Sequence, residues 1–318
     1  MPEPDLLPVS VSAPWGAPDD PRLGRWLGRQ RSLPDARLGG TRVVLVGFPS
    51  DEGVRRNRGR PGAAAGPRAI REALYAMTPD AANHNAFTAL LDRTADLGDV
   101  RVTGDVETDQ QRLGAVLAPL LREGVVPIVL GGGHETTYGH VLGYAAAAPD
   151  IDLELLNWDA HPDVRPFEHG AHSGSPFRQM LLSDYGQYAR YRVAGLQPHR
   201  TARHHVGFVE AHLGQVVWRH ELDRKRVTEI VEDCGGTTLA TFDLDAVDAA
   251  HAPGVSAPNA GGLSASLWLH AAYETARSPH VTSLDVVELN PTYDVDGRTA
   301  QLAALTVWTF LEGLAERS

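Results

Sequence analysis

The chain has 318 residues, of which 42% are apolar and 22% are charged, a balance typical of a globular protein with a sizeable core. Its net charge of -11 argues against a nucleic-acid partner, because phosphate backbones are bound through basic patches. Cys234 is the only cysteine, which excludes a disulfide framework and a cysteine-based zinc or iron–sulfur site. We expect it to be a small buried residue rather than a nucleophile.

Residues 1–40 are rich in proline, glycine and aspartate and predict an irregular N-terminal arm. They lack the basic and apolar regions of a secretory signal. No apolar run in the chain approaches the roughly 20 residues of a membrane span. We therefore expect a cytoplasmic protein with no membrane partner.

From residue 41 on, the chain alternates between apolar runs typical of buried strands and stretches with helical periodicity. The expected elements, in chain order, are a strand at 41–48, helices at 66–77 and 109–124, a strand at 125–132, a helix at 136–148, strands at 151–159, 191–196, 237–245 and 280–289, and a helix at 299–316. Alternating strands and helices predict right-handed βαβ units. The expected fold is one α/β domain over residues 41–318, with a mostly parallel sheet covered by helices on both faces.

Acidic and histidine side chains are concentrated where four of the expected strands end. The four segments supply His134, then Asp159, His161 and Asp163, then Asp243 and Asp245, and finally Glu288. Ligands of open parallel sheets bind beyond the carboxyl ends of the strands, and residues two apart on a strand share a face. We therefore expect these side chains to converge on one site.

Four carboxylates and two imidazoles form an oxygen-rich ligand set without sulfur, which suits Mn²⁺, with Fe²⁺, Co²⁺ or Ni²⁺ as substitutes. Around one divalent ion these carboxylates would leave a charge of about -2 in the pocket, whereas two ions would neutralise them. The ligand set therefore predicts a metal pair, most simply with Asp159 and Asp243 bridging. A single Asp-x-His would more often be a turn or a cap, but three strand ends are harder to explain in that way.

Four motifs occur in the order and approximate spacing of a known enzyme family. They are GGGHE (131–135), NWDAHPD (157–163), TFDLDAVD (241–248) and DVVELNP (285–291). With these motifs the chain, from about residue 41 to its C-terminus, resembles the manganese ureohydrolases, which include arginase, agmatinase and formimidoylglutamase. The resemblance implies an arginase-like, three-layer α/β/α fold with a binuclear manganese site.

The resemblance also assigns roles to the motif residues. It implies that Glu288 binds the amidine or guanidinium group of the substrate. It implies two metal sites, one formed by His134, Asp159, Asp163 and Asp243, and the other by Asp159, His161, Asp243 and Asp245.

Within the family, three further stretches are most similar to formimidoylglutamase. They are the arginine-rich loop at 51–71, HSGSPFRQ at 172–179 and AHAPGVSAP at 250–258. Agmatinase carries a proton-shuttling histidine where this chain has Ser173, which argues against an arginase or agmatinase of standard mechanism. His172, one position earlier, is the candidate for the proton-shuttling role.

A substrate of the formimidoylglutamase kind combines an amidinium group with two carboxylates. We expect Asp163 to carry the proton of the attacking water to the leaving amine, and Glu288 to pair with the cationic nitrogens. N-formimidoyl-L-glutamate would yield formamide and L-glutamate. Arginine binds carboxylates through paired hydrogen bonds, and the expected substrate-binding residues are Arg56, Asn57, Ser173 and Arg178.

Two other functions remain open. A guanidino-acid hydrolase that releases urea would share every metal ligand and differ only in its substrate pocket. A non-catalytic metal-binding protein on the same scaffold would be expected to lose a ligand or Glu288, and all of them are present. The resemblance further implies a homo-oligomer, and the leading function would belong to histidine breakdown.

Overall fold

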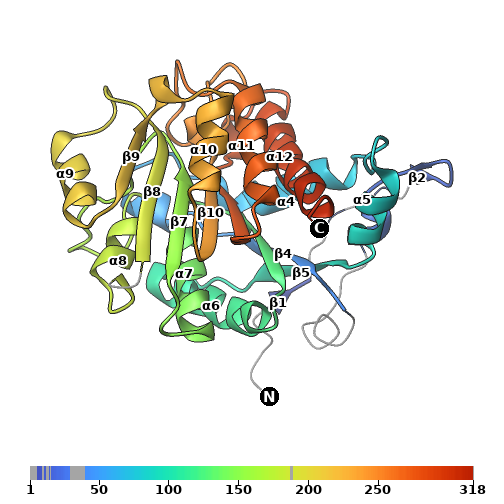
Figure 1. The fold of residues 1–318 in the computed structure, drawn as a ribbon, viewed down its shortest axis with the longest axis horizontal. Coiled ribbons are helices and arrows are strands. Elements are labelled where there is room, and N and C mark those ends of the chain that lie inside the picture. Colours follow the sequence, from blue (N-terminus) through green and yellow to red (C-terminus); the bar gives the residue numbers. More distant parts are fainter. Residues whose placement is uncertain are drawn as a thin grey trace.

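The computed structural model describes residues 6–8, 11, 14, 16–28, 40–186 and 189–317. A nine-stranded sheet runs through the middle of the molecule, and helices pack on both of its faces (Figure 1). Neighbouring strands in this sheet are parallel, except for the antiparallel first pair. In sheet order the strands are β1 (Leu6–Leu7), β5 (Thr94–Val100), β4 (Val43–Phe48), β6 (Val126–Gly131), β11 (Val281–Val287), β10 (Thr237–Asp243), β7 (Leu153–Trp158), β8 (Ala189–Leu196) and β9 (Gln215–Trp218). The predicted mostly parallel sheet is confirmed.

The helices form two layers, because successive side chains of a strand point to opposite faces of the sheet. On β4, for example, Val43 and Leu45 join one apolar core, while Val44 and Val46 join the other. The first layer contains α4 (Gly66–Tyr75), α5 (His84–Leu91), α10 (Arg224–Glu232), α11 (Ala265–Arg277) and α12 (Arg298–Ala315). The second contains α6 (Val106–Arg122), α7 (Thr136–Ala147), α8 (Pro176–Leu182) and α9 (Arg203–Ala211). The three-layer arrangement is therefore confirmed.

Three strands of the sheet, β1, β5 and β9, were not predicted, and β1 lies in the expected irregular arm. β9 is a short edge strand of four residues. β5 contains Asp96, Gly98 and Asp99, residue types that are depleted in strands. Asp96 is nevertheless fully buried, because Arg71 of α4 donates to both of its carboxylate oxygens, at 2.7 and 3.0 Å. This ion pair joins positions 25 residues apart, so no local pattern reveals it.

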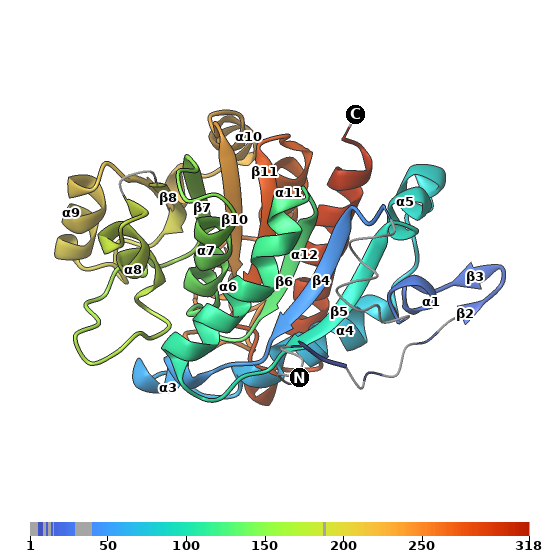
Figure 2. The same cartoon turned by 90° about the horizontal axis from the view of Figure 1, so that it is seen from below.

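The described part of the N-terminal 40 residues contributes several short elements. β1 pairs with β5, a small hairpin is formed by β2 (Gly16–Ala17) and β3 (Asp20–Pro21), and α1 (Gly24–Leu27) follows. The hairpin projects from the β5 end of the molecule (Figure 2). The remainder of the predicted arm lies outside the described residues, so the division of the chain at residue 40 stays a prediction. In the described part of the chain, no helix is both long and apolar enough to cross a bilayer.

In the structure, polar residues such as Asp105 and Asp159 lie at or just beyond the ends of helices and strands. The helix predicted from residue 109 begins at Val106, because the carboxylate of Asp105 accepts a hydrogen bond from the backbone of Thr108 at 2.9 Å and caps it. β7 ends at Trp158, immediately before Asp159. Since β6, β11, β10 and β7 are neighbours, their carboxyl ends lie together along one edge of the sheet.

Candidate active site

Four neighbouring strands deliver the acidic and histidine motifs to one place. His134 follows β6, Asp159 follows β7, Asp243 is the last residue of β10, and Glu288 follows β11. All four side chains are buried. The sheet order therefore brings together residues that lie up to 154 positions apart in the sequence.

A first group of possible metal ligands surrounds the Nδ1 atom of His134. This atom lies 3.0 Å from Oδ2 of Asp163, 3.0 Å from Oδ2 of Asp243 and 3.4 Å from Oδ2 of Asp159. Ligand atoms of these four residues all lie within 4.8 Å of one another, close enough to share one ion. The structure thus brings together the four residues expected for one metal.

A second group lies around His161. Its Nδ1 atom is 3.2 Å from Oδ2 of Asp245 and 3.6 Å from Oδ1 of Asp159. Asp159 therefore faces the His134 group with Oδ2 and the His161 group with Oδ1, the arrangement of a bridging carboxylate. The second group contains three of the four expected ligands. A bridging role of Asp243 stays a prediction.

The electrostatics of this cluster fit divalent cations. Burial and the charge of Asp163 raise the pKa of Asp159 to about 6. Burial, together with Asp245 and Asp159, raises the pKa of Asp243 well above its usual range. Within the described part of the chain, Nδ1 of His134 and Oδ1 of Asp245 are buried and have no hydrogen-bond partner of normal geometry. A cation in each ligand group would give these atoms a partner and compensate the carboxylate charge.

Asp163 and Glu288 have unusual backbone conformations. Their φ angles are 41° and 69°, in the left-handed region that residues with a Cβ rarely adopt. Oε1 of Glu288 accepts a hydrogen bond from the backbone nitrogen of His134 at 2.9 Å. Strained residues of this kind cluster at functional sites, where the surrounding structure holds them in place.

A polar cluster from three segments lies next to the carboxylates. The side-chain amide of Asn57 donates to Oγ of Ser173 at 3.0 Å, and Arg165 donates to Oδ1 of Asn57 at 2.9 Å. The charge of Arg165 also contributes to lowering the pKa of Asp163, in addition to the larger effect of His134. Arg165 is exposed, so its guanidinium can meet a ligand that enters beside Asp163.

Arg165 did not figure among the predicted site residues, although the sequence contains a signal for it. It continues the two-residue spacing of Asp159, His161 and Asp163 by one further step. The signal is the position of a cation two residues after the last carboxylate of the motif.

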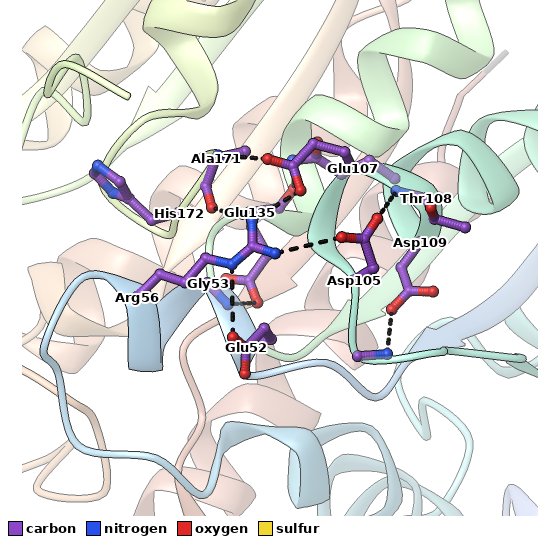
Figure 3. Close-up of polar contacts among 12 residues, drawn as sticks. Glu52, Gly53, Arg56, Asp105, Glu107, Thr108, Asp109, Glu135, Ala171 and His172 are labelled. Atoms are coloured by element: carbon purple, nitrogen blue, oxygen red, sulfur yellow. Dashed lines mark hydrogen bonds and ion pairs between the residues drawn. The ribbon is translucent and has the colours of Figure 1, made fainter. Parts of the chain in front are cut away.

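The ring of His172 is engaged within its own loop. Its Nε2 atom lies 3.0 Å from the carbonyl oxygen of Pro166, and its Nδ1 atom accepts from the backbone nitrogen of Gly174 at 3.2 Å. Figure 3 shows the ring directed away from the cluster around Arg56. In this conformation neither nitrogen is free to pass a proton to a substrate.

Two arginines predicted to bind substrate have other partners. Arg178 donates to the carbonyl oxygen of Val164 at 3.1 Å, and its guanidinium stacks on Phe208 at 4.2 Å from the ring centroid. Arg56 forms an ion pair with Glu107 at 2.8 Å (Figure 3). Both guanidinium groups therefore support the protein itself in this structure.

The chain matches the model of the arginase family over residues 41–312. A formimidoylglutamase from Rhodococcus jostii is 42% identical over 275 residues, which cover 82% of each chain. A formimidoylglutamase from Chromobacterium violaceum is 37% identical over 297 residues, which cover 90% of this chain and 91% of the relative.

A solved structure supports the same assignment. The crystal structure of Trypanosoma cruzi formiminoglutamase with Mn²⁺ has a TM-score of 0.84 and 30% sequence identity, covering 94% of this chain and all of that chain. The metal-ligand groups described above lie at the carboxyl ends of three central strands, β6, β7 and β10. The chain belongs to the arginase family.

Proposed function

We propose that the protein is a binuclear manganese hydrolase that cleaves the formimidoyl C–N bond of N-formimidoyl-L-glutamate. The overall reaction consumes one water and releases formamide and L-glutamate. The observation that carries the proposal is the bridging position of Asp159 between the His134 and His161 groups, with Arg165 on the substrate side. The similarity to proteins named formimidoylglutamase supports the same substrate.

The proposed metal ligands are those expected from the motifs. When bound, the two cations would supply a water whose pKa is lowered toward neutrality and would balance the charge of the carboxylates. The residues that would hold them are His134, Asp159, His161, Asp163, Asp243 and Asp245.

The other residues act on the substrate. Glu288 uses one oxygen to hold the backbone of His134, which leaves its second oxygen to pair with the amidinium nitrogens. Asp163, whose Oδ2 atom lies 3.0 Å from Nδ1 of His134, carries the proton from the attacking water to the leaving amine. Arg165, assisted by Asn57 and Ser173, binds a substrate carboxylate through charge-assisted hydrogen bonds.

An assay of the Mn²⁺-loaded protein tests this proposal. N-formimidoyl-L-glutamate is offered beside a panel of guanidino compounds, and glutamate, formamide and urea are measured. The expected result is glutamate with formamide, lost in Asp243→Ala and retained in the exposed control Asp152→Ala. Urea from a guanidino acid would instead establish the guanidino-acid hydrolase, and binding of metal without turnover would favour the non-catalytic protein.

The proposal also includes the pathway, the cellular compartment and the assembly of the protein. The reaction would serve histidine breakdown in the cytoplasm, on a small anionic amidine and without nucleic acid or membrane as partner. The family resemblance supports a homo-oligomer. Light scattering of the eluted protein tests the assembly, and a mass equal to one 34.3 kDa chain would contradict it.

A further inference from the structure

Arg56 connects three segments that are far apart in the sequence (Figure 3). Its Nη1 atom donates to Oε2 of Glu107 at 2.8 Å and to the carbonyl oxygen of Ala171 at 3.2 Å. Two further carboxylates, of Asp105 and Glu52, each lie 3.5 Å from other nitrogens of the guanidinium. The segment after β4, the start of α6 and the loop before α8 therefore meet at one side chain.

Glu107 completes this connection from the other side. Its Oε1 atom accepts a hydrogen bond from the backbone nitrogen of Ala171 at 2.7 Å. Arg56 and Glu107 together thus hold both backbone polar groups of Ala171, and we call the three residues the Ala171 clamp. Gly170 permits this close approach, because a Cβ at that position would lie 3.0 Å from Nη1 of Arg56 and 3.3 Å from Oε1 of Glu107.

The clamp is adjacent to the substrate side of the site. Arg56 immediately precedes Asn57, and Ala171 lies two residues before Ser173. Asn57 and Ser173 bond to each other at 3.0 Å, and Asn57 also accepts from Arg165. The clamp therefore acts on the two backbone segments whose side chains orient Arg165.

The helix that carries Arg56 is fixed at its other end as well. In α3 (Glu52–Arg56), the backbone nitrogen of Gly53 donates to Oε1 of Glu135 at 2.9 Å. Glu135 is fully buried and also accepts from Ser50 at 3.2 Å. With α3 anchored at its beginning, the clamp at its end determines where Asn57 lies.

We propose that Arg56 and Glu107 are positioning residues for substrate recognition. They hold Ala171 so that Ser173 stays against Asn57, and Asn57 then directs Arg165 toward the substrate carboxylate. This role rests on the proposed function, and it replaces the expectation that Arg56 binds the substrate itself. A purely structural ion pair at a partly exposed site would affect stability slightly and substrate recognition not at all.

Kinetics of Arg56→Met and Glu107→Gln distinguish the two roles. Arg56 and the Ala171 nitrogen donate to different oxygens of Glu107, and in glutamine one of these two positions becomes an NH2 group, which cannot accept. We expect KM for N-formimidoyl-L-glutamate and the inhibition constant of L-glutamate to rise about tenfold, the effect of one charge-assisted hydrogen bond. We expect kcat to change by less than about twofold and the bound Mn²⁺ to be unchanged.

Matched controls separate this effect from the loss of any ion pair. Arg68 and Glu72 form an exposed pair with the same 2.8 Å separation, so Arg68→Met and Glu72→Gln should leave KM unchanged. Arg56→Lys, which keeps the charge, should restore part of the affinity. The double variant Arg56→Met/Glu107→Gln should cost no more than the larger single effect, because both residues act through Ala171.

Hydrogen exchange provides a readout that does not depend on the reaction. The amide of Ala171 should exchange faster in Arg56→Met and Glu107→Gln than in Arg68→Met. An unchanged exchange rate at Ala171 would overturn the positioning role of Arg56 and Glu107. So would a fall in kcat and in bound Mn²⁺ by the same factor as the rise in KM. A wild-type protein that leaves N-formimidoyl-L-glutamate intact would overturn the proposed function instead, and the exchange rates would still decide the clamp.

Discussion

Oγ1 of Thr241 lies 3.1 Å from Nε2 of His134, and this contact begins a chain of hydrogen bonds that ends at a buried carboxylate. Thr241 lies 3.3 Å from the hydroxyl of Thr137, which donates to Oδ1 of Asp285 at 3.2 Å. The groups at the two ends of this chain determine which atom donates in each hydrogen bond. Nε2 of His134 donates when Nδ1 faces a cation, and the carboxylate of Asp285 accepts. Each threonine hydroxyl therefore accepts from one neighbour and donates to the next.

The chain predicts that Thr137→Val and Thr241→Val weaken metal binding equally. Outer partners of a ligating histidine typically contribute about 10–100-fold in affinity, because they orient the ring and set its tautomer. Interruption at either threonine should have the same effect, so the double variant should be no weaker than the single ones. Calorimetric titration with Mn²⁺ measures this, with Thr238→Val as the control, since the buried Thr238 hydroxyl has no hydrogen-bond partner among the described residues. Additive losses would contradict a continuous chain.

Removal of metal should lower the melting temperature. A ligand that binds only the folded state contributes about 2.7 kcal/mol per site at a free concentration about 100 times its dissociation constant. Because Asp159 faces both ligand groups, Asp159→Asn should abolish most of the stabilisation by Mn²⁺. Thermal melts with Mn²⁺ and with a chelator measure the difference, and equal melting temperatures for the wild-type chain would refute a metal centre here.

Arg71→Met should destabilise the fold strongly. Arg71 and Asp96 are fully buried, and removal of one partner of such a pair costs about 3–5 kcal/mol because the other charge loses its compensation. The nearby Arg68→Met removes an exposed ion pair and should cost about 0–1 kcal/mol. Denaturant unfolding measures both values, and similar losses for the two variants would contradict the role of burial.

Cys234 should react with thiol reagents only after unfolding. The residue is 2% exposed, as the composition led us to expect, and burial, reinforced by the charge of Glu154, raises the pKa of its thiol to about 12. The thiolate is the reactive form. At pH 8 the thiol of Cys234 in the folded protein is therefore both uncharged and shielded from the reagent. Absorbance after addition of a disulfide reagent measures the reaction, and the protein in guanidinium chloride is the control. Rapid labelling of the folded protein would show that the site opens.

The candidate metal ligands could be predicted from the sequence because they follow a local pattern of alternating residues at the ends of strands. Asp159, His161 and Asp163 alternate after a strand, and Asp243 and Asp245 repeat the pattern. In a parallel sheet the carboxyl ends of the strands share one edge, so the sequence predicts the edge at which these side chains lie. Their convergence also requires β6, β10 and β7 to lie close together in the sheet, which the structure decided.

The residues on the proposed substrate side were harder to predict from the sequence, because they have long side chains and lie in loops. Arg56 and Arg178 each have several rotatable bonds, and their partners lie as far as 115 and 30 residues away in the sequence. Residue type alone predicts that such arginines bind carboxylates. It does not tell whether the acceptor belongs to a ligand or to the protein.

Periodicity and the spacing of polar residues by themselves determined the α/β class, the parallel sheet and the set of candidate metal ligands, since these depend on the two-residue and 3.6-residue repeats of the backbone. The tertiary structure decided which strands are neighbours, that Arg71 compensates the buried Asp96 where β5 pairs with β4, and that Arg165 rather than Arg56 bonds to Asn57. These features depend on contacts between distant segments, and the direction of a long polar side chain is settled only by the partners that packing brings within its reach.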